Sequence, residues 1–260
     1  MKPFQFSLLL SGVLVLAMPS AYGQPGPRGA GPQGPSFTGA MGKLFGDNQN
    51  FTANMELETT MASGQTMTMP GKIAVMEGKS RFEMDMAQIK GAAMPPGAAA
   101  QMKSMGMDKT VMISRPDRKV NYQIFPSLLA YVETPTEDPD AGKSASDFKV
   151  ETTELGKEMI AGHPCVKSKA IVTDNEGGKH EATIWTASDL HNFPVKIEQT
   201  QQGNLGTMIF TDIKMTKPDA GLFEAPADYT KYNSPQTLMQ QQMMKRFNGG
   251  QGIPARPPQQ

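Results

Sequence analysis

The sequence is poor in cysteine and has no surplus of positive or negative charge. Cys165 is the only cysteine among 260 residues, which excludes an intrachain disulfide, a cysteine-rich zinc module and an iron–sulfur site. Its alternation with Lys167 and Lys169 places it on the polar face of a predicted strand. Lysine plus arginine equal aspartate plus glutamate at 25 each, whereas a nucleic-acid-binding protein needs a basic excess. We therefore expect no nucleic acid among the partners.

The motifs of common enzymes are also absent. The sequence contains no nucleophile elbow, Walker loop, dinucleotide-binding fingerprint or His-Glu-x-x-His run. Its three histidines, His163, His180 and His191, are not spaced like paired metal ligands. We therefore expect a protein that is not an enzyme and needs no cofactor.

A long apolar run occurs only near the N-terminus. Lys2 precedes apolar residues 8–18, and Ala21-x-Gly23 has the small-x-small pattern of a cleavage site. The run is shorter than the ~20 residues that a membrane-spanning helix needs. The sequence thus predicts a signal peptide at 1–23 and a periplasmic or secreted mature chain without a transmembrane segment. No cysteine follows the leader directly, so we expect no Cys-acylated lipoprotein.

The remaining chain divides into three parts. Residues 24–42 are rich in glycine and proline without an apolar period, which predicts a disordered arm. Residues 43–230 alternate apolar and polar side chains between short turn sequences, a pattern typical of half-buried antiparallel strands. We expect a single mainly β domain there, a large curved antiparallel sheet or unclosed β-barrel with short covering helices. Residues 231–260 predict a short amphipathic helix, starting at Ser234-Pro235, and a disordered tail.

The strands of this domain are separated by turn residues. They are expected at 51–57, 66–76, 82–86, 109–115, 119–125, 147–155, 164–173, 180–187, 193–201 and 205–216.

Two segments interrupt the strand pattern. Residues 88–108 contain two adjacent prolines followed by a short stretch rich in alanine and methionine that predicts a helix. Residues 126–133 begin with proline and serine and continue with Leu128 and Leu129, which predicts a helical turn or two. Because such helices must cover apolar surface, we expect 126–133 to form a lid on the concave face of the sheet. The acidic residues 134–146 predict a loop.

Methionine is unusually frequent, with 21 residues in the chain. The flexible thioether suits an adaptable apolar surface, and it is also a soft ligand for Cu(I). We favour an apolar lining for Met84 and Met86, which share a predicted strand face with Phe82. The candidate copper ligands are three methionines of the 88–108 insertion: Met102, Met105 and Met107.

Four stretches of the predicted domain form a pattern that is also found in a known family: 155–165, 184–186, 193–197 and 222–229. Together they resemble exported bacterial proteins related to the periplasmic outer-membrane lipoprotein carriers, and most closely a sister family known as a domain of unknown function. The resemblance spans about residues 43–230. It implies an unclosed antiparallel barrel whose covering helices enclose a hydrophobic cavity, which in the carriers holds acyl chains.

The resemblance also implies a set of lining residues, with two leucines on the lid. These are Phe82, Met84, Met86, Val111, Ile113, Tyr122, Ile124, Leu128 and Leu129.

Three hypotheses for the function follow. The leading one is an exported, non-catalytic binding protein that holds a lipid or another hydrophobic ligand in this cavity. The first alternative is a methionine-rich Cu(I)-binding protein of the cell envelope. The second alternative is a structural interaction module whose arm and tail recruit an envelope protein partner.

Overall fold

The computed structural model describes residues 37–91, 97–136, 138, 140–143, 145–201 and 203–249. The predicted signal peptide, residues 24–36 of the predicted arm and the end of the predicted tail lie outside these residues. The described strands are β1 (Asn50–Thr60), β2 (Thr66–Met76), β3 (Lys79–Asp85), β4 (Lys90–Gly91), β5 (Lys109–Arg115), β6 (Val120–Phe125), β7 (Ala130–Pro135), β8 (Phe148–Ile160), β9 (His163–Asp174), β10 (Lys179–Ala187), β11 (Phe193–Gln201), β12 (Asn204–Lys214) and β13 (Thr230–Tyr232). The helices are α1 (Gly39–Leu44), α2 (Ala98–Ser104) and α3 (Pro235–Gly249), and the 3₁₀ turns are η1 (Met86–Gln88), η2 (Pro126–Leu128), η3 (Ala145–Asp147) and η4 (Ala220–Phe223).

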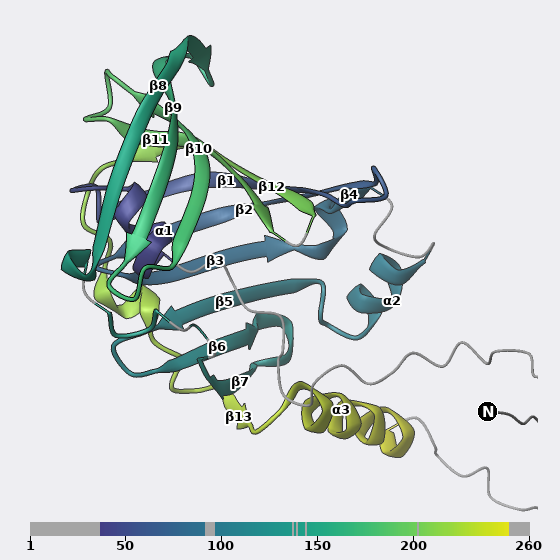
Figure 1. Ribbon diagram of the computed structural model, residues 1–260. Coiled ribbons are helices and arrows are strands. Elements are labelled where there is room, and N and C mark those ends of the chain that lie inside the picture. Colours follow the sequence, from purple (N-terminus) through teal and green to yellow (C-terminus); the bar gives the residue numbers. More distant parts are fainter. Residues whose placement is uncertain are drawn as a thin grey trace, which may run out of the picture. The chain divides into compact units, whose positions relative to one another are not determined.

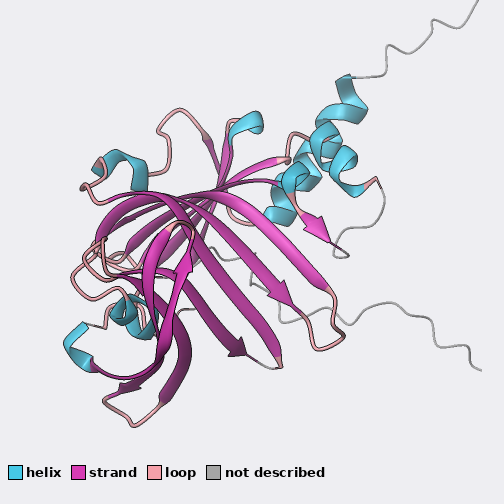
Figure 2. Cartoon of the chain, turned by 90° about the horizontal axis from the view of Figure 1, so that it is seen from above, coloured by secondary structure: helices cyan, strands magenta, loops and turns pink. Residues whose placement is uncertain are grey.

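All the strands belong to one 13-stranded sheet (Figures 1 and 2). The strand order is β13-β7-β6-β5-β3-β2-β1-β12-β11-β10-β9-β8, and β4 pairs with β2 beside this path. Because the order ends at two different strands, the sheet is unclosed. The predicted mainly β, single-domain fold is confirmed. One pair departs from the antiparallel expectation, since β13 runs parallel to β7.

The sheet curves around α1, which lies on its concave side (Figure 1). The helix is flanked by two phenylalanines that pack against three more from β1, β11 and β12. Their ring centroids are 4.9 to 6.4 Å apart and the rings are almost fully buried. This phenylalanine cluster, which fills one end of the concave face, consists of Phe37, Phe45, Phe51, Phe193 and Phe210.

The position of α1 corrects the predicted arm of residues 24–42. Phe37 is only 2% exposed, and the residues that follow it form the helix. The acidic loop holds the helix N-terminus in place: the Ala40 amide donates to Asp140 Oδ2 at 3.3 Å, and the Thr38 hydroxyl donates to Asp138 at 2.6 Å. The ordered chain therefore begins before residue 43, because one aromatic anchor and two carboxylates offset the flexibility of a glycine-rich segment.

Of the helical turn or two predicted at 126–133, one is present, but the rest of the predicted lid is wrong. Only η2 is helical, and from Ala130 onward the chain forms β7. Ala130 and Val132 are both 1% exposed, so the segment alternates like a half-buried strand. Leu129 joins the two elements in a left-handed conformation, with φ of 46°. In the segment 88–108, α2 agrees with the predicted short helix.

The segment after β12 packs against both faces of the sheet. Phe223 is fully buried on the outer face, against residues of β2, β5 and β6. The chain then adds β13 beside β7 and continues into α3, whose Leu238 is fully buried against Phe125 and Val132. The predicted helix start is confirmed, because the Thr237 amide donates to Ser234 Oγ at 3.1 Å. Among the described helices, none has the length and apolar character needed to cross a bilayer.

Candidate ligand-binding surface

Beyond the phenylalanine cluster, the concave face carries a group of methionines that the register brings together. Leu57 of β1 lies directly opposite Met69 of β2 on one side and Met208 of β12 on the other. Met84 of β3 lies opposite Gly71, two residues along β2 from Met69. We call Leu57, Met69, Met84 and Met208 the methionine patch.

The methionine patch is an apolar surface whose residues remain partly exposed to solvent. Its four side chains are half-buried and pack against the main core cluster. Beside them on the same face lie Met55 and Phe82, which are 2% and 1% exposed. A Cβ on Gly71 would come within 2.4 Å of Phe82 Cε2, so the missing side chain lets that ring lie flat against β2. The patch thus borders the buried core of the concave face, and its own residues stay partly exposed.

The nine residues predicted to line a cavity do not lie together. Phe82 is part of the concave-face core, and Met84 belongs to the methionine patch. Met86 lies in η1, after the end of the strand. Leu128 packs beside Leu238 in a separate cluster, and Leu129 is 56% exposed. The other four pack on the outer face beneath Phe223: Val111, Ile113, Tyr122 and Ile124.

The predicted lining residues lie on two different faces of the sheet because of the register between the strands. Phe82 lies opposite Met112 in β5, so Val111 and Ile113, its neighbours in sequence, point to the other face. Alternation shows which residues of one strand share a face, but a one-residue offset between strands reverses the assignment. Sequence reasoning missed Met69 and Met208 for this reason, although both strands were predicted.

The candidate copper ligands lie in and after α2. Met102 is within the helix, and the Met107 amide donates to the Met102 carbonyl at 2.9 Å. Met107 packs against the cluster that contains Leu238, which gives its thioether an apolar role. In the part of the chain that the structure describes, no group of three or more His, Cys, Asp or Glu side chains is placed to hold a metal ion.

Cys165 does not lie on a polar face as expected. It is 3% exposed within the main core cluster, and its thiol donates to the His163 carbonyl at 3.3 Å. Burial raises the pKa of this thiol, which keeps it protonated and unreactive. The prediction failed because Cys165 pairs with Ala187 near Phe193, where the core reaches the end of β9.

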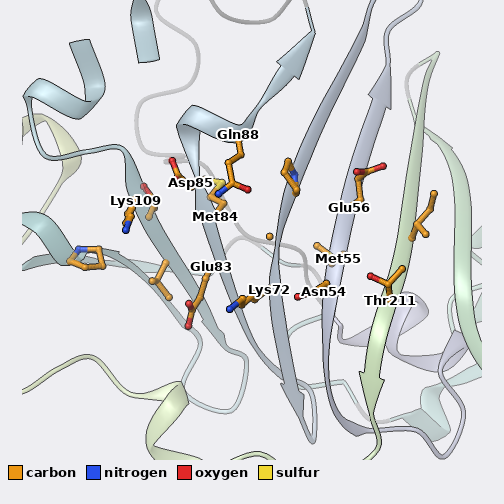
Figure 3. Close-up of a pocket in the computed structure, with 16 residues that line it drawn as sticks. Asn54, Met55, Glu56, Lys72, Glu83, Met84, Asp85, Gln88, Lys109 and Thr211 are labelled. Atoms are coloured by element: carbon orange, nitrogen blue, oxygen red, sulfur yellow. The ribbon is translucent and has the colours of Figure 1, made fainter. Parts of the chain in front are cut away.

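A pocket of about 680 Å³ lies over β12, β1, β2, β3 and β5 (Figure 3). Exposed polar and charged residues of the outer face line it, among them Asn54, Glu56, Lys72, Glu83 and Lys109. A solvated outer face is the usual partner of a buried inner face in an antiparallel sheet. Met84 of the methionine patch also lines the pocket, so its lining combines polar and apolar groups.

On the outer face, Arg115 holds the C-terminal segment in place. Its guanidinium is nearly buried and donates to both carboxylate oxygens of Asp117, at 2.9 and 2.8 Å. It also donates to the Phe223 carbonyl at 3.2 Å and to Glu224. The Asp117 hydrogen bonds raise the pKa of Arg115 well above its ordinary range, so the cation is permanent.

The fold and surface define an unclosed β protein with an apolar concave face. The chain belongs to the family described as "Domain of unknown function (DUF4412)", whose model matches residues 51–193. This match confirms the expected membership of a family of unknown function. Among curated proteins, none matches the chain.

Solved structures with a similar fold come from several bacteria. The chain is 9% identical to the lipoprotein LppX of Mycobacterium tuberculosis, with a TM-score of 0.39, covering 69% of this chain and 93% of that one. It is 9% identical to a LolA superfamily protein of Nitrosomonas europaea, with a TM-score of 0.35, covering 70% and 93%. It is 12% identical to LprF of Mycobacterium bovis, with a TM-score of 0.37, covering 66% and 90%.

Proposed function

We propose that this protein binds the hydrophobic chain of a lipid or similar amphiphile on the methionine patch. The observation that carries the proposal is that Leu57, Met69, Met84 and Met208 form a continuous apolar surface that the described chain leaves partly exposed. Covering such a surface stabilises a complex by roughly 25 cal/mol per Å² of apolar area removed from water. Unbranched thioethers adjust their rotamers, so the patch fits chains of different length and saturation.

Neighbouring elements bound this surface at both ends. The phenylalanine cluster fills the concave face beside α1, so a ligand chain is confined to the other end of the strands. At that end α2 contacts η1, which directly follows β3 and Met84. A chain lying on the patch would therefore run between the phenylalanine cluster and α2.

The experiment is a fluorescence titration of the protein, purified without detergent, with cis-parinaric acid as the probe. A Met84→Asp variant places a charge within the patch, and we expect its dissociation constant to rise at least about tenfold, because the carboxylate must lose water when the chain binds. Leu155→Asp is the matched control, since Leu155 is 56% exposed on edge strand β8, away from the patch. Equal affinity of the two variants would show that the ligand does not lie on the methionine patch.

A further inference from the structure

The exposure of the described methionines to solvent depends on where they lie in the sheet. Met55 and Met112 are buried, at 2% and 7% exposure. Met69, Met84 and Met208 are half-buried on the methionine patch. Met159, which is 63% exposed, lies on edge strand β8, and three strands separate β8 from β12, which carries Met208. The chain therefore contains shielded, partly accessible and freely accessible thioethers.

The three patch thioethers are close enough to act on one ligand. Directly opposed side chains on neighbouring strands have Cβ atoms about 4.5–5.5 Å apart, and diagonal neighbours about 7–8 Å. Met69 and Met208 each oppose Leu57, and Met84 is the diagonal neighbour of Met69. A chemical change at any one of them alters the surface on which a hydrophobic chain would lie.

Oxidation is the reaction that a partly accessible thioether undergoes. The sulfur attacks the terminal oxygen of a hydroperoxide, an S–O bond forms, the O–O bond breaks, and water or an alcohol leaves. The sulfur loses two electrons and the peroxide is reduced by the same two. The product sulfoxide is polar and is returned to the thioether by methionine sulfoxide reductases.

We propose that Met69, Met84 and Met208 form an oxidation-sensitive site, at which sulfoxide formation by hydroperoxides releases the hydrophobic ligand and bound ligand protects the sulfurs. This inference rests on the proposed function. An oxidised patch would bury a strong hydrogen-bond acceptor against a hydrocarbon chain that has no donor for it. A bound chain in turn protects the sulfurs, because it covers the patch and keeps peroxide away from them.

The first experiment maps sulfoxide formation by peptide mass spectrometry after hydrogen peroxide treatment, with and without palmitate. We expect palmitate to slow oxidation of the three patch methionines at least about threefold, because a bound chain covers them. Oxidation of Met159 should be unchanged, since it is exposed on edge strand β8, which three strands separate from β12. Met55 should oxidise slowly in both samples because it is buried.

The second experiment measures cis-parinaric acid binding before and after peroxide treatment. We expect the affinity to fall at least about tenfold and to return after treatment with methionine sulfoxide reductases A and B. The control is a triple variant, Met69→Leu, Met84→Leu and Met208→Leu, which keeps apolar volume and removes sulfur. Its affinity should be the same before and after peroxide treatment, because it has no thioether on the patch to oxidise.

The outcomes separate this inference from the proposed function. If the untreated protein binds neither cis-parinaric acid nor palmitate, the proposed function is wrong. If it binds both but peroxide leaves the affinity unchanged, the oxidation site is wrong and the proposed function stands. The same conclusion follows if peroxide weakens the triple variant as much as the wild type, because other methionines would then be responsible.

Discussion

Arg115 joins a turn of the sheet to a segment more than a hundred residues later in the chain. Its hydrogen bonds to Asp117 lower the pKa of that carboxyl, which outweighs the opposing effect of burial. For Glu224, burial alone would raise the pKa, but the hydrogen bonds and charges of Arg115 and Arg118 lower it overall. Both carboxylates thus stay ionised in the folded protein at a pH where the unfolded chain takes up protons.

This difference predicts acid sensitivity. The ordinary carboxyl pKa values are 3.8 for Asp117 and 4.5 for Glu224, so the stabilisation is complete above that range and is lost as the pH falls through the lowered values. In urea unfolding, Arg115→Met should cost about 2 kcal/mol at neutral pH. The difference from wild type should shrink steadily as the pH is lowered below 4.5.

The control for this measurement is Lys169→Met, which breaks an exposed pair between Lys169 and Glu181 at 2.8 Å. Exposed pairs contribute at most about 1 kcal/mol, so this variant should unfold close to the wild type. A constant difference between Arg115→Met and wild type down to pH 3, on the order of 2 kcal/mol throughout, would contradict the role of the two carboxylates.

At the scale of elements, α1 belongs to the core, although the glycine-rich composition of its segment predicted disorder. Phe37 precedes the helix and contacts the rings of Phe45, Phe51 and Phe210 at 5.3, 6.2 and 6.4 Å. Phe37→Ala should therefore lower the free energy of unfolding by about 3–4 kcal/mol, measured by urea denaturation. Leu155→Ala, at an exposed position of β8, should change it by less than about 0.5 kcal/mol. Similar effects of the two changes would mean that Phe37 belongs to a dispensable arm.

Most strands could be predicted from the sequence, because alternation and turn residues are local signals. β1, β2, β5 and β9 lie within a few residues of their expected positions. β7 was missed because Pro126 and Ser127 are also typical of a helix start. β13 was missed because three residues carry too little pattern, and their pairing depends on a contact with a strand about 100 residues earlier.

The sequence could predict the chemical character of the candidate surface, but not which residues lie together on it. The abundance of methionine indicated an adaptable apolar lining, and Met84 was assigned to it. The positions of Met69 and Met208 beside Leu57 depend on the pairing of β1 with both β2 and β12. The second of these pairings joins residues that are about 150 positions apart, and no local pattern encodes it.

At the scale of the whole described chain, one C-terminal segment packs on both faces of the sheet. Phe223 is buried on the outer face and Leu238 on the concave side, and both are 0% exposed. Between them β13 pairs with the edge strand β7, and the Thr230 amide donates to the Leu129 carbonyl at 2.8 Å. The segment covers an edge that would otherwise present unpaired backbone groups.

This arrangement predicts that the two anchors are energetically coupled although the sheet separates them. Phe223→Ala and Leu238→Ala should each lower the free energy of unfolding by about 2–5 kcal/mol. If loss of one anchor lets the segment leave the sheet, the second substitution removes a contact that is already partly lost. The double variant should then be destabilised by at least about 1 kcal/mol less than the sum of the single effects.

The matched control is the pair Phe223→Ala and Phe148→Ala, because Phe148 is a buried residue of β8 at the opposite edge of the sheet. These two substitutions should add within about 0.5 kcal/mol. If the effects at Phe223 and Leu238 add equally well, the outer-face contact and α3 dock independently. In that case release of α3 would leave the outer face intact, and the segment would not act as one unit.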